Sequence, residues 1–561
     1  MRFHILGIPH TVTSKEYNAC AYTQKVVKFG KMMTQRGHTV IHYGHEDSDL
    51  ICSEHVSVIT NKDLEIAYGN YDWRKNFFKF DVNDHAYQTF YKNAIAEVGK
   101  RKQKNDFILP FWGHGVRPIC DAHQHDMIVV EPGIGYAGGH WARWKVFESY
   151  SIMHAFYGMQ GVGHCQSDWY DVVIPNYFDE EDFIYSEEKE DYILFLSRVY
   201  EGKGIHIAVQ AAQAAGVKLI VAGQNPDNLQ FPDNVTYVGY ADVETRKRLM
   251  AKAKGLIVAS LYMEPFGGVQ IESLLSGTPT ITTDWGAFTE NNIQGVTGYR
   301  CRTFADFVNA MKNVDKIKSS DCRKQGERFL LQNVAPMYEK YFQDVLNVYT
   351  GKGWYEIKKK KEPKKIFIDC GTHMFQGFEK HRLNLNIDNK WVIHGFEANP
   401  YVYEAAKDLR KNYISEGLNF NHHNLAVGTK TKSSTVNCAW AGYLGGFLHV
   451  GSNTLKNPPA VDTVFGENFD YVEKRIHEIN FSDFVKNICD DEDYSILKMD
   501  IEGSEFEVLD HMILTGAIKL FKEVYIEFHQ RFFDNPSFYE QKILKYKEFF
   551  KENNIILRED G

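Results

Sequence analysis

The stretch LIVASLYMEPFGGVQIESLLSGTPTITTDWGAFTE, residues 256–290, most constrains what this chain can fold into. Its first residues are apolar and β-branched, as in a strand that is buried on both faces. Pro265, Gly267 and Gly268 interrupt the backbone, residues 269–276 predict a helix, and TPTITT predicts a second strand. A strand, a turn, a helix and a strand in this order are typical of a parallel α/β sheet.

Two carboxylates flank this turn: Glu264 before it, and Glu272 one turn into the predicted helix. On one continuous helix, residues at this spacing differ by about 80° in heading. With Glu264 in the loop instead, both carboxylates can converge on the helix start from opposite sides. The N–H groups of Gly267 and Gly268 lie there beside the positive end of the helix dipole, which favours phosphate. Two solvated carboxylates are the alternative, and the accompanying glycines and strands make it the weaker one.

The segment EPFGGVQIE resembles the signature of retaining glycosyltransferases of the GT-B fold, specifically glycosyltransferase family four (glycosyl transferases group 1). In that family the first glutamate lies by the donor sugar, the second hydrogen-bonds the nucleotide ribose, and the loop N–H groups hold the diphosphate. The resemblance implies a catalytic role for Glu264. It implies donor-binding roles for Phe266, Gly267, Gly268 and Glu272.

An α/β rhythm also opens the chain. RFHILGI predicts a strand, residues 22–36 predict an amphipathic helix, and TVIHYG predicts the next strand. Because this opening is similar to the first lobe of the same family, we expect residues 1–175 to form a Rossmann-like lobe on the acceptor side. We expect residues 176–350 to form the donor lobe, with a last helix that returns to the first lobe. The aromatic residues of 70–92 form either an insertion near the acceptor or part of the core.

A glycine-rich segment, GIGYAG at residues 133–138, follows the predicted strand MIVVE. It fits the dinucleotide-binding pattern, but it lies deep in the lobe and does not open directly into a helix, so we expect no dinucleotide there. Members of the resembling family place a histidine in this region, beside the anomeric centre of the donor sugar. His140 or His114 could take that catalytic role, and Glu131 could replace it.

The loop SRVYEGKG after the predicted strand YILFL carries Arg198 and Lys203. The resemblance assigns both to the donor diphosphate. Departure of a nucleoside diphosphate builds negative charge, which fixed cations stabilise in the transition state. One exposed Arg or Lys is commonplace, but this loop lies at the carboxyl end of a strand, where open α/β sheets bind ligands. The GT-B resemblance implies no obligatory metal for this transfer.

A lysine-rich stretch, residues 351–364, predicts a solvated linker, and a third α/β unit starts at Lys365. Asp369 and Gly371 end its first strand, and Glu397 ends its second. A glycine at such a position permits close backbone approach, and a carboxylate on the second strand can accept both ribose hydroxyls. A nucleoside-containing ligand is therefore expected here.

The sequence order DCG, FEANP, LAVG and LKMDIEGSEFEVL resembles FkbM-type S-adenosylmethionine-dependent O-methyltransferases over most of residues 365–530. The resemblance implies a Rossmann-like class I methyltransferase domain at residues 365–561, with S-adenosylmethionine as its cofactor. The cofactor-site residues it implies are Asp369, Gly371, Glu397, Asp500 and Glu502.

Two features of this third unit depart from the pattern or leave it open. His373 to Phe375 stand before Gly377 where the family has a closer second glycine, which predicts a reshaped cofactor loop. Glu505 also matches the acidic motif, and its position in a helix is equally that of a solvated or capping carboxylate. Residues 440–469, rich in Gly, Pro and Asn, predict a long loop that covers the acceptor.

Composition limits the classes of function. At 561 residues the chain exceeds a single core. We expect no membrane span, because no apolar run is long enough, and the N-terminus lacks the apolar core of a signal peptide. Scattered cysteines without a C-x-x-C pair favour a reduced, cytoplasmic setting. A net charge of −9 argues against general nucleic-acid binding. No metal site is expected, since His123 and His125 point to different sides of a presumed helix.

These features predict a bifunctional α/β enzyme: a hexosyl- or pentosyltransferase of two Rossmann-like lobes, followed by an O-methyltransferase. The expected ligands are a nucleoside diphosphate sugar, S-adenosylmethionine, and a glycan or other hydroxyl acceptor. One alternative is a glycosyltransferase whose third unit only binds acceptor or partner. Others are a glycan-binding protein without catalysis, and a sugar-nucleotide epimerase on the same fold.

Overall fold

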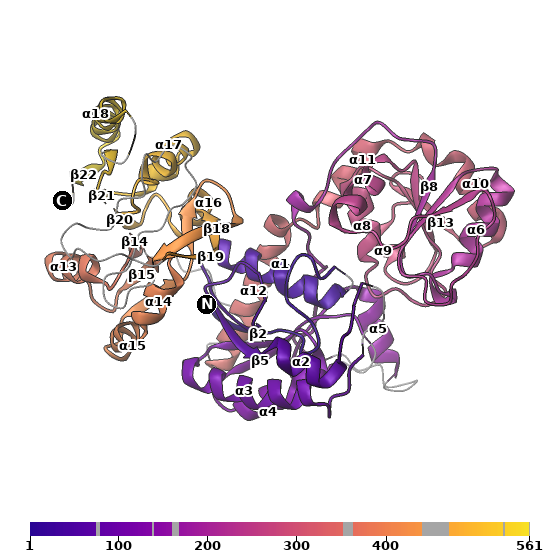
Figure 1. Cartoon of the computed structure of the whole chain (residues 1–561), viewed down its shortest axis with the longest axis horizontal. Helices are drawn as coiled ribbons and strands as arrows, with labels where there is room; N and C mark the ends of the chain where they lie inside the picture. The colour runs from indigo at the N-terminus through magenta and orange to yellow at the C-terminus, as the bar shows by residue number, and fades with distance from the viewer. Residues whose placement is uncertain are drawn as a thin grey trace.

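A computed structural model describes residues 1–18, 20–74, 79–136, 140–159, 168–351, 363–439, 471–530, 533 and 535–559. Three α/β units follow one another along the chain, with the first unit between the other two (Figure 1). The predicted linker at residues 351–364 and the predicted acceptor loop at residues 440–469 lie almost entirely outside the described residues.

The first unit is a seven-stranded parallel sheet in the order β3-β2-β1-β4-β5-β6-β7. Its strands are β1 (Arg2–Leu6), β2 (Thr39–His45), β3 (Glu54–Ile59), β4 (Phe107–Pro110), β5 (Ile128–Ile134), β6 (Trp144–Phe147) and β7 (Val172–Val173). Its helices are α1 (Ala21–Gln35), α2 (Asn61–Tyr68), α3 (His85–Arg101), α4 (Arg117–His123) and α5 (Tyr150–Met159). The predicted helix at residues 22–36 is therefore present, and it begins and ends one residue earlier.

The second unit is a six-stranded parallel sheet in the order β10-β9-β8-β11-β12-β13. Its strands are β8 (Ile193–Leu196), β9 (Leu219–Ala222), β10 (Val235–Tyr237), β11 (Gly255–Val258), β12 (Thr280–Thr283) and β13 (Gly298–Cys301). Its helices are α6 (Ile205–Ala215), α7 (Val243–Lys252), α8 (Gly268–Leu275), α9 (Phe288–Asn291), α10 (Phe304–Asn313) and α11 (Ser319–Glu327). Strands β8, β11 and β12 are buried throughout, because helices cover both faces of the sheet.

One long helix, α12 (Leu331–Tyr349), leaves the second unit and packs on the first. Its residues Tyr338 and Phe342 belong to the same buried cluster as Phe3 of β1 and Phe29 of α1. The rings of Phe3 and Phe342 lie 4.7 Å apart. This helix therefore fixes the two lobes to each other through the core of the first.

The third unit is a six-stranded parallel sheet in the order β16-β15-β14-β20-β21-β22, with a smaller sheet β17-β19-β18 beside it. Its strands are β14 (Lys365–Cys370), β15 (Trp391–Phe396), β16 (Asn419–His423), β17 (Ala426–Gly428), β18 (Lys432–Ala439), β19 (Tyr471–Asn480), β20 (Tyr494–Met499), β21 (Glu523–Ile526) and β22 (Ile556–Glu559). Its helices are α13 (Gln376–Leu385), α14 (Pro400–Ala405), α15 (Lys407–Ser415), α16 (Phe481–Ile488), α17 (Glu505–Thr515) and α18 (Pro536–Glu552).

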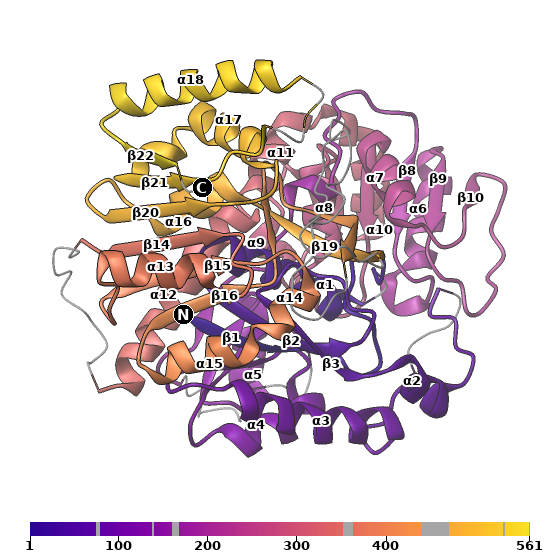
Figure 2. The ribbon, with the colours of Figure 1, turned by 60° about the vertical axis from the view of Figure 1, so that its left-hand side comes forward.

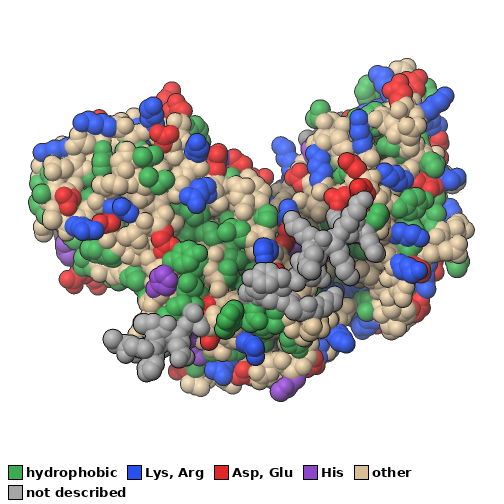
Figure 3. Space-filling view, turned by 180° about the vertical axis from the view of Figure 1, so that it is seen from behind, with side chains coloured by type: hydrophobic (Ala, Val, Ile, Leu, Met, Phe, Trp, Pro, Cys, Tyr) green, Lys and Arg blue, Asp and Glu red, His purple; other side chains and the backbone are tan. Residues whose placement is uncertain are grey.

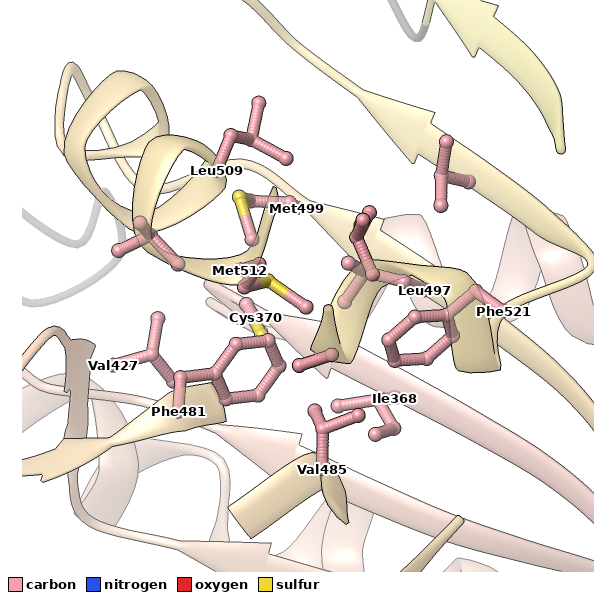
Figure 4. Packing of buried hydrophobic residues seen from close by; sticks show 14 of the residues in the cluster. Ile368, Cys370, Val427, Phe481, Val485, Leu497, Met499, Leu509, Met512 and Phe521 are labelled. Atoms are coloured by element: carbon pink, nitrogen blue, oxygen red, sulfur yellow. The ribbon is translucent and has the colours of Figure 1, made fainter. Parts of the chain in front are cut away.

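Helices α16 and α17 cover one face of this third sheet. Figure 4 shows Ile368 of β14 and Leu497 of β20 packed against Val485 of α16 and Met512 of α17. All four side chains are fully buried. This packing holds β14 and β20 side by side, so that the loops leaving their carboxyl ends meet above the sheet.

The third unit docks on the first unit, away from the donor lobe. Its edge strand β16 lies beside β2, where Thr39 donates a hydrogen bond to Asn421 at 2.8 Å (Figure 2). Asp49 forms an ion pair with Arg475 at 2.6 Å. Seen from behind, the donor lobe and the third unit stand apart with a notch between them (Figure 3). Among the described helices, none combines the length and apolar character needed to cross a bilayer.

Candidate active sites at two sheet switch points

In the sheets of the second and third units, the strand order reverses at the centre. In the second unit the first strand in the chain, β8, lies next to the fourth, β11. In the main sheet of the third unit, the first strand, β14, likewise lies next to the fourth, β20. Open α/β sheets bind ligands at the carboxyl ends of the strands at such a switch point. Lys203 and Glu264 lie on loops that leave β8 and β11, and Gly371, Asp500 and Glu502 lie on loops that leave β14 and β20.

In the donor lobe, the loops after β8 and β11 meet through a charged pair. Lys203 Nζ lies 2.5 Å from Glu264 Oε1, and Ser260 Oγ donates to the same oxygen at 2.7 Å. The Glu264 side chain is buried, and Lys203 is half-buried. The Lys203 ammonium also lies over the ring of Tyr262, 4.8 Å from its centroid. Two of the residues predicted to take part in donor chemistry, Lys203 and Glu264, are therefore in direct contact.

The glycine pair opens helix α8, one residue earlier than predicted. Gly267 is its N-cap, with a left-handed φ of 77°, and a Cβ at that position would lie 2.5 Å from the ring of Phe288. Gly268 has ordinary backbone geometry and room for a Cβ. Phe266 is 2% exposed and packs among Phe178 and Phe329, so it anchors the turn. The turn thus presents its backbone N–H groups from a rigid base.

Glu272 and Arg198, which the resemblance assigns to the donor, each contact a neighbouring side chain. Glu272 accepts a hydrogen bond from Arg246 at 2.6 Å, so its carboxylate is held by a cation from α7. Arg198 is exposed, and its guanidinium lies over the ring of Tyr200 at 5.4 Å. The sequence analysis missed Arg246, because nothing in the motif links α7 to α8 before the sheet order is known.

The structure does not bring either candidate histidine to Glu264 within the described residues. The His140 N–H donates to Glu131 at 3.2 Å, and its ring packs on Phe156 at 4.5 Å. His114 lies in a short 3₁₀ turn, exposed, 6.3 Å from the ring of Trp141. Glu131 is fully buried and also accepts from the Ala142 N–H at 2.9 Å; burial raises the pKa of its carboxyl. Its contacts organise the loop that carries His140.

The glycines of the GIGYAG segment pack against side chains of the first lobe. Gly133 belongs to β5, its carbonyl accepts from Lys25 Nζ at 3.1 Å, and a Cβ at Gly135 would meet the Glu148 carboxylate at 2.5 Å. Lys25 and Glu148 form a buried ion pair. The described part of this segment therefore makes room for that pair.

In the third unit, the loops after β14 and β20 touch at Gly371. A Cβ there would lie 1.8 Å from the Asp500 carbonyl oxygen, and the φ of Gly371 is +84°, so only glycine fits. Asp369 is buried 3.2 Å from Lys498 Nζ, which also donates to the Gly371 carbonyl at 3.0 Å. Burial raises the pKa of the Asp369 carboxyl, although Lys498 opposes the shift.

Glu397 ends β15 at the edge of the same site. One carboxylate oxygen accepts the His373 N–H and the other the Asn399 N–H, each at 2.9 Å. Burial raises the pKa of the Glu397 carboxyl to about 7. In the loop before α13, His373 and Phe375 have left-handed φ angles of 46° and 64°, and the Phe375 ring is fully buried.

A histidine that the sequence analysis missed completes the acidic motif. His529 follows β21 and is 1% exposed. Its Nε2 lies 3.4 Å from Glu502 and 3.9 Å from Asp500. Glu505 is not solvated, as one interpretation had it: it is fully buried and accepts the N–H groups of Gly503 at 2.8 Å and His529 at 2.6 Å. The sequence signal for this histidine is weak: Glu527 and His529 follow the strand EVYI directly.

The fold and these sites define a chain of Rossmann-like units with two separate switch-point sites. The model of glycosyl transferases group 1 matches residues 178–329, and the model of the methyltransferase FkbM domain matches residues 369–552. The chain is thus similar to glycosyl transferases group 1 in its second unit and to FkbM methyltransferases in its third.

Curated relatives match only part of the chain. An uncharacterised glycosyltransferase of Methanocaldococcus jannaschii is 27% identical, over 29% of this chain and 45% of the relative. The O-antigen chain mannosyltransferase RfbU of Salmonella typhimurium is 27% identical, over 27% of this chain and 46% of the relative. Glycogen synthase of Mycobacterium tuberculosis is 29% identical, over 22% and 33%. The matches span less than half the length of these relatives.

Solved structures align with part of the chain. AviGT4, a glycosyltransferase involved in avilamycin A biosynthesis, aligns with a TM-score of 0.46 at 17% identity, over 62% of this chain and 98% of that chain. Anabaena HepE in complex with UDP-glucose aligns with a TM-score of 0.45 at 15% identity, over 61% and 99%.

Proposed function

We propose that the chain is a bifunctional enzyme that glycosylates a hydroxyl acceptor and methylates a hydroxyl on the sugar just added. Residues 1–350 transfer a hexose or pentose from a nucleoside diphosphate sugar, with retention of anomeric configuration. Residues 365–561 transfer a methyl group from S-adenosylmethionine. The observation that carries the proposal is the Lys203–Glu264 pair beside the α8 N-terminus, at a switch point of the sheet.

In the glycosyl transfer, the leaving diphosphate gains negative charge as its bond to the sugar breaks. The Gly267–Gly268 turn offers backbone N–H groups at the positive end of α8, and Lys203 and Arg198 offer two cations nearby. Glu264 is held toward Lys203 by the contact at 2.5 Å. We assign Glu264 to the sugar side of the site, where a buried carboxylate can stabilise positive charge at the anomeric carbon, and Glu272 to the nucleotide ribose.

The catalytic histidine of the resembling family stays a prediction. His140 and His114 are the two candidates, and His140 has the more constrained surroundings because its backbone is tied to Glu131. A donor that enters between the lobes would have to draw one of them toward the sugar. The described contacts in the donor lobe do not require either one.

The residues of the third unit fit S-adenosylmethionine. Gly371 lies against the backbone at Asp500, which leaves no room for a Cβ, and Asp369 is a buried carboxylate at the strand end. Glu397 ends the second strand, where its carboxylate can accept hydrogen bonds from the ribose hydroxyls of a nucleoside. Bound there, S-adenosylmethionine supplies an electrophilic methyl group. The chain's own residues orient the nucleoside and exclude water around it.

Docking of the third unit on the first lobe supports a link between the two reactions. The contacts of Thr39 with Asn421 and of Asp49 with Arg475 hold the methyltransferase unit on the lobe assigned to the acceptor. A glycan released from one site therefore stays at high effective concentration near the other. Seven described cysteines are buried thiols, which supports the cytoplasmic setting that we propose.

The first half is tested by a panel of nucleoside diphosphate sugars with mass-spectrometric detection of transfer. Glu264→Ala should lower turnover by at least about a hundredfold, since it removes a charge that acts on the transition state. The matched control is Glu201→Gln, which neutralises an exposed carboxylate in the Lys203 loop. Unchanged turnover in Glu264→Ala would remove that residue from the mechanism. Donor consumption without acceptor would favour an epimerase.

A second candidate is a glycosyltransferase whose third unit only binds acceptor or partner. The left-handed His373 and Phe375 in the cofactor loop favour it, because a loop with this geometry differs from the glycine-rich form of the family. Calorimetry with S-adenosylhomocysteine separates the two candidates. Stoichiometric binding supports methyl transfer, and absence of binding supports the second candidate.

A further inference from the structure

Three side chains of the third unit converge on one point above the carboxyl ends of β20 and β21. Asp500 and Glu502 come from the turn after β20, and His529 comes from the segment after β21. One ligand atom from each lies within 4.8 Å of the other two. Glu527 adds a fourth group, with an oxygen 3.4 Å from His529 Nε2. Two kinds of ligand, carboxylate and imidazole, therefore face the same small volume.

The buried Glu505 orients the histidine. Its carboxylate lies 3.3 Å from His529 Nδ1, on the side of the ring opposite the cluster, and also accepts the His529 N–H. A carboxylate next to one ring nitrogen fixes the orientation of the ring, and here it turns the other nitrogen, Nε2, toward the carboxylates of the cluster. This carboxylate–histidine arrangement is common behind metal ligands, and it is an observation independent of the acidic residues in the cluster.

The cluster also lies beside the expected methyl donor. Asp500 contributes its side chain to the cluster and its backbone carbonyl to the contact with Gly371. Glu502 and Asp500 remain accessible, with side-chain exposures of 44% and 31%, whereas His529 and Glu505 form the buried floor. A small ligand can therefore enter from the side where an acceptor would approach.

We propose that Asp500, Glu502 and His529 bind one divalent cation of the Mg²⁺ or Mn²⁺ class, which positions the acceptor hydroxyl for methylation. Oxygen-rich sites that include carboxylates suit these ions. The role assigned to the cation rests on the proposed methyl transfer, whereas binding of the cation does not. It departs from the expectation from sequence that the chain holds no metal.

The cation would orient the acceptor and ease its deprotonation. A sugar hydroxyl loses its proton more readily beside a divalent cation, because the positive charge stabilises the oxygen. The oxygen lone pair then forms the bond to the methyl carbon, while the carbon–sulfur bond breaks and leaves its electron pair on the sulfur, which becomes neutral. The proton passes to solvent, which reaches the site through the half-exposed Glu502.

The test is titration of Mn²⁺ into the full-length, chelator-treated protein, without nucleotide, with free Mn²⁺ measured by electron paramagnetic resonance. We expect one Mn²⁺ per chain. Glu502→Gln and Asp500→Asn should weaken its binding by at least about tenfold, and Glu505→Gln by about 10- to 100-fold through loss of histidine orientation. The control is Glu507→Gln, an exposed carboxylate on the same helix, α17, which should bind like the wild type.

Two results would overturn the inference: no saturable Mn²⁺ site in the wild type, or weakening in Glu507→Gln equal to that in Glu502→Gln. Thermal melts of each variant show whether it is folded, and Glu502→Gln is the decisive variant because its side chain is half-exposed. Calorimetry with S-adenosylhomocysteine on the same samples separates the two claims. Nucleoside binding without Mn²⁺ binding removes the cation alone, whereas Mn²⁺ binding without nucleoside binding leaves the cation site and removes the proposed methyl transfer.

Discussion

Ionisation of Glu397 should control how tightly the third unit binds its nucleoside. Burial raises the pKa of this carboxyl to about 7, while two backbone N–H groups favour its charged form. The carboxylate can accept hydrogen bonds from both ribose hydroxyls, and the protonated acid must use one oxygen as a donor. The form that binds well is therefore the one that predominates above neutral pH.

The magnitude follows from this pKa. With a pKa of about 7, about one Glu397 in eleven is ionised at pH 6 and about ten in eleven at pH 8. If only the carboxylate binds, the dissociation constant for S-adenosylhomocysteine falls about tenfold over this range, or about 1.4 kcal/mol. The sign for stability is opposite. Because the pKa of the folded state lies above the unfolded value, the carboxyl's contribution is full below about pH 4.5 and is lost as the pH rises through 7.

Calorimetry with S-adenosylhomocysteine at several pH values measures this effect. Glu397→Gln is the matched control, because it keeps the side-chain shape and does not titrate. Any pH dependence that comes from ionisation of the ligand affects both proteins equally. We expect the wild type to gain affinity between pH 6 and 8 relative to Glu397→Gln. Parallel pH profiles for the two proteins would refute the assignment of Glu397 to the ribose.

Three further predictions concern the first two lobes and the docking of the third unit. Lys203→Met should lower glycosyl transfer about 10²- to 10³-fold, measured as kcat, with Lys203→Arg retaining part of it. Gly267→Ala should destabilise the donor lobe by about 1–3 kcal/mol in thermal unfolding, because its φ is left-handed and its Cβ would meet a ring, whereas Gly268→Ala should be nearly neutral; equal effects would contradict the description of the turn. Asp49→Arg, which faces Arg475, should lower the yield of doubly modified product at low acceptor concentration while each separate reaction persists.

Much of the fold is predictable because its strands are continuous apolar runs between turn residues. Stretches such as LIVAS at 256–260 and YILFL at 192–196 have no polar face, as strands covered by helices on both sides require. Gly267 and Gly268 likewise mark the start of α8 to within one residue. These features are local, so the sequence contains them directly.

The parts that sequence reasoning missed depend on which strands are neighbours. His529 meets Asp500 only because β21 lies next to β20, and Arg246 meets Glu272 only because α7 packs beside α8. The candidate histidines show the same limit. His140 follows a strand at a suggestive position, yet the folded loop directs its backbone to Glu131.

The central claim is that two ligands bind at two switch points of one chain. Diffraction from crystals soaked with a nucleoside diphosphate and S-adenosylhomocysteine tests it most directly. We predict density for the diphosphate against Lys203 and the N-terminus of α8, and density for the adenosine ribose against Glu397. Density for the diphosphate outside the loops after β8 and β11, or for the nucleoside outside those after β14, β15 and β20, would contradict the account.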